Sequence, residues 1–480
     1  MSDPTKAKTS ALRALPSVDQ LLRTEPALRL REAVGAPRIT ALARTVTEEI
    51  RAEIQAGEWT TCAREALLEE SVARLETACA RERNSGIRRV INATGVILHT
   101  NLGRAPLPEV ARLAIAREGA GYCTLEYDLE SGSRGRRGAR VEELLIYLSG
   151  AEDALVVNNC AAAALLILSV LAQDGDTIVS RGELVEIGGD FRVPDVMASS
   201  GTRMIEVGTT NRTRLDDYRR AITERTRLIM RVHPSNYRIV GFTTSPTLSE
   251  LAGLAHEANL VLFEDAGSGV LIDLEEHGLG DEPLVRDCIS AGADVVSFSG
   301  DKLLGATQAG LIVGRREIIG RLRSNPLYRA LRVDKLSLVA LEATLEAHSR
   351  GTSIQEIPAL RMLALSLEEI QQRARSLVEQ ISQKRLDPAL TISVVIGESA
   401  VGGGSGPNTH PPTALICLEH STLSADEIQR RLRSSSPPVI ARIADEKVLI
   451  DLRTVAPGEE FEILAALNLL NLDHSHSPNE

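Results

Sequence analysis

Apolar and polar positions follow three different patterns along the chain. In residues 1–83 apolar side chains recur at helical spacing between charged faces, as in "VDQLLRTEPALRLREA". From residue 84, where Asn, Ser and Gly interrupt that pattern, short apolar runs alternate with helical stretches as far as residue 340. Residues 341–480 combine helical segments with a few short strands. We therefore predict an N-terminal helical domain over residues 1–83, a core over residues 84–340 and a small α+β domain over residues 341–480.

Short apolar runs predict the strands of the core. Runs of this length are typical of strands buried on both faces of a sheet, and helical stretches such as "AAAALLILSVLAQ" separate several of them. The alternation predicts an α/β fold with a largely parallel, doubly wound sheet of seven strands. Ligands of such sheets bind beyond the carboxyl ends of the strands. The seven runs are 154–159, 176–180, 203–208, 227–232, 260–265, 295–300 and 310–314.

Composition and charge exclude several classes of protein. Of the 480 residues, 43% are hydrophobic and 25% charged, which is typical of a soluble globular protein. No apolar run approaches the roughly 20 residues that a membrane helix needs, and the start "MSDPTKAKTS" is no export signal, so we expect a cytoplasmic protein. The six cysteines lack the paired spacing of a zinc site, and we expect reduced thiols and no metal. A net charge of -11 argues against a protein that coats nucleic acid through bulk charge.

Two charged residues stand where buried strands end. Lys302 follows the strand in "VVSFSGDK", and Asp265 follows "LVLFE". A charge at the edge of a core is costly unless it is exposed, paired or chemically consumed. Taken singly, Lys302 would more often be salt-bridged, and Asp265 could cap the next helix. Taken together they predict a pyridoxal-phosphate (PLP) site, in which the lysine forms a Schiff base and the aspartate holds the pyridine nitrogen protonated.

Polar residues at other strand ends suit the remaining groups of that cofactor. Asn158, Asn159 and Cys160 lie in "VVNNCAAAALL", a strand-to-helix turn whose free N–H groups favour a phosphate. Ser299 could donate its hydroxyl to the same phosphate, and Asn236, after another strand, could bond the ring hydroxyl of PLP. Each residue also has a plain explanation as a helix start or a turn.

Longer blocks of the sequence resemble one family. "RRVINATGVILHTNLGRAPLP", "VSRGELVEIGGDFRVPDVM" and "SFSGDKLLGATQAGLIVG" are similar to bacterial L-seryl-tRNA(Sec) selenium transferases, the selenocysteine synthases, and the similarity extends over essentially the whole chain. The resemblance implies an aminotransferase-like (fold type I) PLP-dependent enzyme that assembles as a homodecamer. It also implies conversion of L-seryl-tRNA(Sec) to L-selenocysteinyl-tRNA(Sec) with selenophosphate, through a PLP aldimine and an aminoacrylyl intermediate, for selenoprotein biosynthesis.

The resemblance also assigns roles to single residues. It makes Lys302 the Schiff-base lysine, Asp265 the partner of the pyridine nitrogen and Asp301 a further catalytic acid. It implies a third asparagine where Cys160 stands, a departure that matters only if a side chain contacts the phosphate. A further set of residues is implied to bind substrate, with a basic pocket for selenophosphate and two threonines near the active site: Arg104, Arg329, Arg332, Thr209 and Thr210.

Plainer interpretations of several residues remain open. In "NPLYRALRVDK", Arg329 and Arg332 are three apart and should share one face of a helix, which could equally be a solvated basic face. Arg104, in a glycine-containing loop, could form a structural salt bridge. His233 is more simply a packed histidine, and we assign Glu183 no stacking role over the cofactor. The stretch "GGGSGPNTHPP" is most simply a flexible loop.

The N-terminal helices are the candidate tRNA-binding region. Residues 1–90 hold fifteen basic and thirteen acidic residues, whereas the chain as a whole is acidic. A helical dimerisation module would have the same sequence features. The candidate arginines are Arg23, Arg29, Arg31, Arg38 and Arg44.

Two other functions compete with selenium transfer. The nearer is a PLP-dependent lyase or transferase that acts on a free amino acid or an amino sugar, although we expect such an enzyme to lack the N-terminal helices. The second is a non-catalytic RNA-binding protein. Intact Lys302 and Asp265 argue against it, because a binding module has no need of this charged pair.

Overall fold

The computed structural model describes residues 4–59, 63–83, 85–188, 191–384 and 387–470. Contacts divide the chain into two compact units, Met1–Arg89 and Val90–Glu480. Asn84, at the predicted linker, and Cys62 lie outside the described residues. The five other cysteines are free thiols, as expected.

The first unit is helical, as the apolar spacing predicts. Its longest helices bury one stripe each and meet in small apolar clusters that include Ile39 and Leu75 in one and Ile50 and Leu67 in the other. Ser17 begins a helix with a capping box. The helices are α1 Pro4–Ala14, α2 Val18–Leu22, α3 Glu25–Val34, α4 Ala36–Ala56 and α5 Arg64–Arg83.

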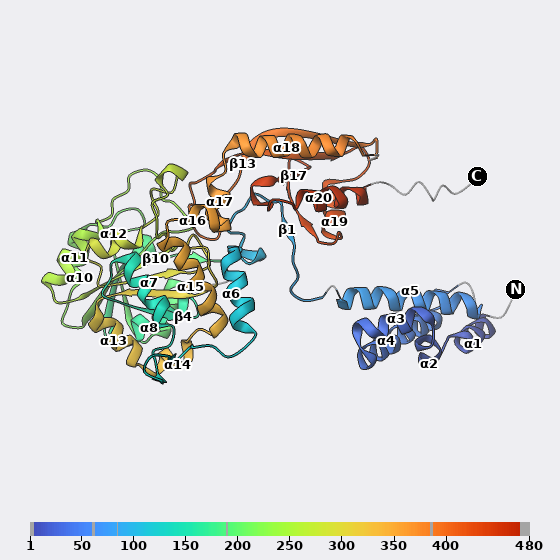
Figure 1. Ribbon diagram of the computed structural model, residues 1–480, viewed down its shortest axis with the longest axis horizontal. Coiled ribbons are helices and arrows are strands. Elements are labelled where there is room, and N and C mark those ends of the chain that lie inside the picture. Colours follow the sequence, from blue (N-terminus) through green and yellow to red (C-terminus); the bar gives the residue numbers. More distant parts are fainter. Residues whose placement is uncertain (1–3, 60–62, 84, 189–190, 385–386, 471–480) are drawn as a thin grey trace. The chain divides into compact units, whose positions relative to one another are not determined.

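A seven-stranded sheet forms the centre of the second unit (Figure 1). All neighbouring strands are parallel except β12, which runs antiparallel to both of its neighbours. The seven predicted strands are therefore confirmed, each within two residues of its predicted ends. In sheet order the strands are β4 Asp153–Val157, β12 Gly310–Gly314, β11 Val295–Ser299, β10 Val261–Gly267, β9 Thr226–Val232, β5 Asp176–Ser180 and β8 Arg203–Val207.

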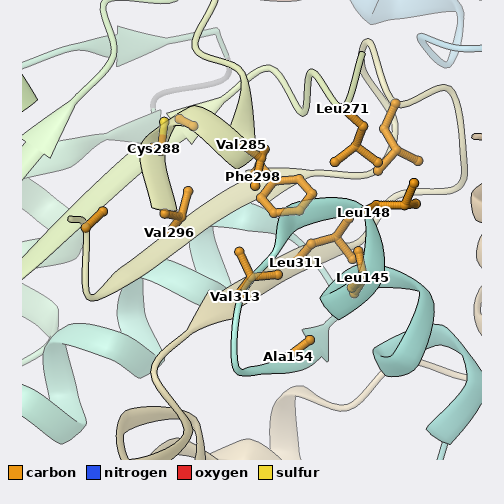
Figure 2. Packing of buried hydrophobic residues seen from close by; sticks show 14 of the residues in the cluster. Leu145, Leu148, Ala154, Leu271, Val285, Cys288, Val296, Phe298, Leu311 and Val313 are labelled. Carbon is orange, nitrogen blue, oxygen red and sulfur yellow. The ribbon is translucent and has the colours of Figure 1, made fainter. Parts of the chain in front are cut away.

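Helices cover both faces of this sheet because successive strand residues point to opposite sides. Val296 packs in the cluster beneath α7, α11, α12 and α15, whereas its neighbour Val295 packs in the cluster beneath α8, α9 and α13. Figure 2 shows the first cluster, in which the ring of Phe298 lies close to Val285 and Leu311. The covering helices are α7 Ala139–Ser149, α8 Cys160–Leu171, α9 Val193–Ser199, α11 Leu248–Glu257, α12 Val285–Ser290, α13 Arg316–Ser324 and α15 Lys335–Ser349.

Shorter elements complete the core and connect its strands. A two-stranded hairpin precedes α7, and a second small hairpin follows β5. These elements are α6 Glu109–Gly119, β2 Tyr127–Asp128, β3 Ser133–Arg134, β6 Glu186–Ile187, β7 Phe191–Arg192, α10 Leu215–Ala221, α14 Pro326–Leu331, α16 Ser353–Glu356 and α17 Pro358–Ala364.

The C-terminal part is a small α+β domain with its own apolar cluster, as predicted. Its antiparallel sheet has the order β13-β14-β17-β16. The short strand β1, Ile91–Asn92, pairs with β15, so residues directly after the first unit join this domain. The remaining elements are α18 Leu367–Ser382, β13 Leu390–Glu398, β14 Pro412–His420, α19 Ala425–Arg433, β15 Val439–Ile440, β16 Arg442–Ala444, β17 Lys447–Asp451 and α20 Glu460–Ala466.

Candidate active site

Lys302 lies just beyond the carboxyl end of β11, at the centre of the sheet. The residue is only 3% exposed, and its Nζ donates to the carbonyl oxygen of Gly404 at 3.4 Å. Burial lowers the pKa of Lys302, because the charged ammonium loses its hydration. A lowered pKa favours the neutral amine, which is the form that attacks a carbonyl carbon or accepts a proton.

Asp265 lies on β10, the parallel neighbour of β11. Its Cα partner across the ladder is Ser297, and the register shifts directly after this pair, before Gly267. Ser297 Oγ donates to Asp265 Oδ1 at 2.9 Å, and the thiol of Cys160 donates to the same oxygen at 3.4 Å. Burial raises the pKa of Asp265 despite both donors. A cationic group placed against the carboxylate would therefore be bound strongly.

The N-terminus of α8 forms the third side of this site. Asn159 caps the helix, and its Oδ1 accepts from the Ala162 amide at 2.8 Å. The side-chain oxygen of Asn158 is buried, and it has no partner among the described residues. A Cβ on Gly310 would lie 2.0 Å from the Asn159 carbonyl oxygen, so only glycine fits the strand beside this turn. The first turn of α8 leaves N–H groups free for an anion.

Ser299 completes this side of the site at the end of β11. The residue is 5% exposed, and it stands three positions before Lys302. It therefore lies at the strand end from which Lys302 extends, and its role as a phosphate donor stays a prediction.

Arg104 and Asp301 form an ion pair beside Lys302. Arg104 Nη1 lies 2.7 Å from Asp301 Oδ2, and Asp301 is 8% exposed. The backbone of Arg104 is left-handed, with φ of 60°, a conformation that costs a non-glycine residue about 1–2 kcal/mol. The amide of Ala105 donates to the Asp301 carbonyl at 3.3 Å, which fixes the Arg104 loop against this strand end.

The other two predicted arginines lie apart from Arg104. Arg332 Nη1 is 3.4 Å from Glu126 Oε1, and Arg329 is exposed on α14. The prediction that Arg329 and Arg332 share a helix face is wrong, because α14 ends at Leu331 and the ψ of Arg332 is 139°. No described contact joins either residue to Arg104. The amide of Asn158 donates to the Leu331 carbonyl, so this end of α14 does adjoin the α8 turn.

The three remaining predicted residues are exposed. Asn236 donates from Nδ2 to the carbonyl of Glu186 at 2.7 Å. Thr209 bonds the Arg212 carbonyl through both its amide and its hydroxyl. Thr210 lines a cavity of about 350 Å³. Lys302 is not among the described residues that line this cavity.

A loop of the C-terminal domain reaches Lys302, which sequence analysis did not predict. Gly402, Gly403, Gly404 and Gly406 all have positive φ. A Cβ on Gly404 would lie 3.7 Å from Lys302 Nζ. The "GGGSG" run was the available signal, since clustered glycines often mark a close approach of backbone.

Glu282 and His233 hold this loop in place. Glu282 Oε1 accepts from the Gly406 amide at 2.6 Å. His233 Nε2 lies 3.5 Å from Glu282 Oε2, and the His233 amide donates to the Asp265 carbonyl at 3.0 Å. His233 thus joins the glycine loop to the strand that carries Asp265.

Comparisons with known proteins identify the family. A family model described as L-seryl-tRNA selenium transferase matches residues 90–456, and a second, described as selenocysteine synthase N terminal, matches residues 12–51. The L-seryl-tRNA(Sec) selenium transferase of Moorella thermoacetica is 47% identical over 95% of this chain and 96% of its own length. That of Alkaliphilus metalliredigens is 50% identical over 82% and 84% of the two chains. The chain belongs to the L-seryl-tRNA(Sec) selenium transferase family.

A solved structure supports the fold. The structure of D-glucosaminate-6-phosphate ammonia-lyase superposes with a TM-score of 0.56 and 22% identity, covering 80% of this chain and 96% of the other. At this identity the likeness shows the fold alone. The predicted aminotransferase-like α/β fold of this selenium transferase family member is confirmed.

The rest of the described chain adds no competing metal or membrane feature. Within residues 4–59, 63–83, 85–188, 191–384 and 387–470, no group of three or more His, Cys, Asp or Glu side chains could hold a metal ion. No helix in the same ranges is long and apolar enough to cross a membrane.

Proposed function

We propose that this enzyme converts L-seryl-tRNA(Sec) to L-selenocysteinyl-tRNA(Sec), with PLP as cofactor and selenophosphate as selenium donor. The observation that carries the proposal is the pair of buried Lys302 and partly exposed Asp265 at adjacent strand ends, in a chain that matches this family over residues 90–456. The alternative, a PLP enzyme for a free amino acid or an amino sugar, would use the same fold and the same kind of lysine and aspartate pair. The match over residues 12–51 favours the tRNA substrate, because it extends the likeness beyond the catalytic fold.

The residues around Lys302 fit the proposed cofactor. A bound PLP ring acts as an electron sink for the α-carbon of the seryl group. Lys302 would hold the cofactor covalently through its neutral amine. Asp265 would accept a hydrogen bond from the protonated ring nitrogen, which gives the carboxylate a cationic partner. The N–H groups of the α8 turn would bind the phosphate, with the side-chain amide of Asn158 beside them and the Ser299 hydroxyl at the facing strand end. Asn236 would need to turn away from Glu186 to reach the ring hydroxyl.

Lys302 is also the base for the proposed reaction. Once the substrate amine replaces it, its neutral Nζ takes the proton from the α-carbon of the seryl group. The Gly404 carbonyl accepts one N–H of this amine, which leaves the lone pair free to point elsewhere. The β-hydroxyl would then leave as water with the proton that Lys302 has taken, and Asp301, paired with Arg104 beside Lys302, is a further proposed catalytic residue. The selenium of selenophosphate would add to the β-carbon, the α-carbon would regain a proton, and hydrolysis of the selenium–phosphorus bond would release phosphate.

Arg104, Arg329 and Arg332 are the proposed ligands of selenophosphate. A guanidinium binds the oxygens of such an anion in a bidentate manner. Arg104 is the nearest of the three to Lys302 and is already oriented by Asp301. Thr209 and Thr210, which are both exposed, are further proposed contacts of the substrate.

Replacing Arg104 with alanine is expected to raise the KM for selenophosphate about a hundredfold, because the anion loses a partly buried guanidinium. The KM for seryl-tRNA(Sec) should change by less than about threefold. Steady-state kinetics with each substrate varied in turn measure both values. Arg112→Ala, on an exposed face of α6, is the matched control. Equal rises in both KM values would contradict a role confined to selenophosphate.

The first unit is the proposed tRNA-binding region. Of its candidate arginines, Arg23, Arg29 and Arg38 pair with acidic residues of the same unit. Arg31 and Arg44 are exposed, and they have no acidic partner among the described residues. Unpaired arginines are the better candidates for phosphate contacts, since no ion pair must be broken first.

Changing Arg31 and Arg44 together to alanine is expected to weaken binding of tRNA(Sec) roughly tenfold. The slope of the logarithm of the binding constant against the logarithm of salt concentration should fall by the amount that about two phosphate contacts contribute. Titrations of the full-length protein at several salt concentrations test this. Arg375→Ala, exposed on α18, is the control for loss of a surface charge. An unchanged salt slope in the double variant would place the tRNA elsewhere.

We also propose a homodecamer, which the family resemblance implies. Large apolar side chains that stand exposed in the single chain support assembly with further copies, because another subunit would bury them. Among them are Leu129, Val240 and Phe242, which are 77%, 81% and 84% exposed. Light scattering of the purified protein gives the mass of the assembly directly.

The visible absorption of the purified protein loaded with PLP tests the proposed reaction. We expect seryl-tRNA(Sec) to change the cofactor band, and ordinary seryl-tRNA and free serine to leave it unchanged. A change with free serine or another small amine would favour the alternative enzyme. A protein that takes up no PLP would contradict both enzymes and the role of Lys302.

A further inference from the structure

Two donors converge on one oxygen of Asp265. Ser297 Oγ lies 2.9 Å from Oδ1, and Cys160 Sγ lies 3.4 Å from the same atom. No donor of the described residues bonds Oδ2. Asp265 is partly exposed, whereas its neighbours Glu264 and Ala266 are buried.

The convergence follows from the fold. Ser297 is the ladder partner of Asp265 on β11, and its side chain is fully buried. Cys160 is the first residue of α8. This helix follows β4, which is separated from β11 by β12 in the sheet. Sγ also lies 3.8 Å from Ser297 Oγ, but a thiol has one proton, and the charged carboxylate is the stronger acceptor. The two donors thus fix one carboxylate oxygen and leave the other free.

Cys160 does not have the surroundings of a reactive cysteine. Burial raises the pKa of its thiol, and the neighbouring Asp265 charge acts in the same direction. The thiol therefore stays protonated at neutral pH and is neither a nucleophile nor a redox centre. Its proton is permanently available for donation to Asp265.

We propose that Cys160 is a positioning residue, which acts through Asp265 to set how firmly the enzyme holds the proton on the ring nitrogen of PLP. The inference rests on the cofactor proposed above. Each donor to Oδ1 stabilises the carboxylate and so lowers its affinity for a proton. A thiol is a weaker donor than a hydroxyl or an amide. Cys160 therefore orients Asp265 and weakens it only slightly as an acceptor of the hydrogen bond from the ring nitrogen. A stronger donor at position 160 would weaken that acceptor more.

The experiment compares three proteins that differ only in the donor at position 160. Cys160→Ser has a stronger donor and Cys160→Ala has none. The other titratable groups that face Asp265, Lys302 from the end of β11 and His233 from the end of β9, are the same in all three. Cys288→Ala, which removes a buried thiol from α12, is the control.

Each full-length protein is loaded with PLP that carries an isotope label at the ring nitrogen, and the nitrogen chemical shift reports its protonation. We expect Cys160→Ser to lower the ratio of protonated to unprotonated nitrogen roughly threefold and Cys160→Ala to raise it by a similar factor. Cys288→Ala should match the wild type. The dissociation constant of PLP, measured in parallel, shows whether each variant still forms the site.

The role of Cys160 would be supported if the nitrogen chemical shift moved in opposite directions, relative to the wild type, in the serine and alanine variants. Both replacements are smaller than cysteine, so a pure packing role would move the two shifts in the same direction. A common direction, or no shift in variants that bind PLP normally, would overturn the inference and leave the proposed function intact. Failure of the wild-type protein itself to bind PLP would overturn both.

Discussion

Replacing Lys302 with alanine is expected to lower the rate of selenium transfer to seryl-tRNA(Sec) by about a thousandfold or more. The variant loses the covalent attachment of the cofactor and the base that moves the α-proton, and proton transfer alone contributes roughly a hundredfold to ten-thousandfold. The visible band of the bound cofactor should also disappear. Turnover with purified components and the absorption spectrum measure the two effects independently.

Two further variants separate chemistry from charge and stability. Lys302→Arg keeps a cation but cannot hold the cofactor covalently, so it should be as inactive as the alanine variant. Lys335→Ala removes the lysine at the start of α15, whose Nζ donates to the Gly121 carbonyl. The activity of this control variant should be near that of the wild type. Lys302→Ala should not lose thermal stability, because a buried amine with a lowered pKa contributes little to folding, whereas Lys302→Arg should be less stable because its charge is permanent. Activity in Lys302→Arg within tenfold of the wild type would refute the assignment.

Local pattern was enough to predict the sheet. Strands such as β4 and β12 are buried along their whole length, and each appears in the sequence as a short apolar run, "ALVV" and "LIV", between small or polar residues. The carboxyl ends of β10 and β11 then follow from the parallel order of the sheet. This is why Lys302 and Asp265 could be placed together from sequence alone.

Contacts between residues distant in sequence could not be predicted in this way. Gly404 is 102 residues from Lys302, and Cys160 is 105 residues from Asp265. Nothing in the local sequence indicates either pair. Each requires the C-terminal loop or the α8 turn to be placed in three dimensions.

The error at Arg332 was of a different kind. Helical spacing holds only while the helix continues, and α14 has six residues and ends before Arg332. Sequence rules place the ends of such short helices poorly, because a single extended residue stops them. The separation of Arg329 from Arg332 is therefore a boundary error in an otherwise correct helix.

Replacing Asp265 with asparagine is expected to lower turnover about a thousandfold while leaving PLP covalently bound. The amide keeps the shape of the carboxylate but removes the charge that holds the ring nitrogen protonated, and an unprotonated ring is a poor electron sink. The nitrogen chemical shift of labelled PLP should accordingly change to the unprotonated value. Turnover and that shift are the two measurements.

Asp265→Asn should lower turnover but should not lower the thermal stability of the cofactor-free protein. Burial raises the pKa of Asp265, so the ionised carboxylate is strained in the cofactor-free protein, and asparagine relieves that strain. Cofactor-free Asp265→Asn should therefore unfold at a temperature equal to or above that of the wild type, and PLP should stabilise it less. Asp294→Asn is the matched control. Asp294 is a buried aspartate, and it accepts a hydrogen bond from Arg315 at 2.9 Å. It lies just before β11, at the opposite end of that strand from Lys302. The control should lose stability and keep its cofactor spectrum, because its charge is paired within the protein. Loss of stability in Asp265→Asn with turnover retained would mean that the Asp265 carboxylate serves folding and not the cofactor.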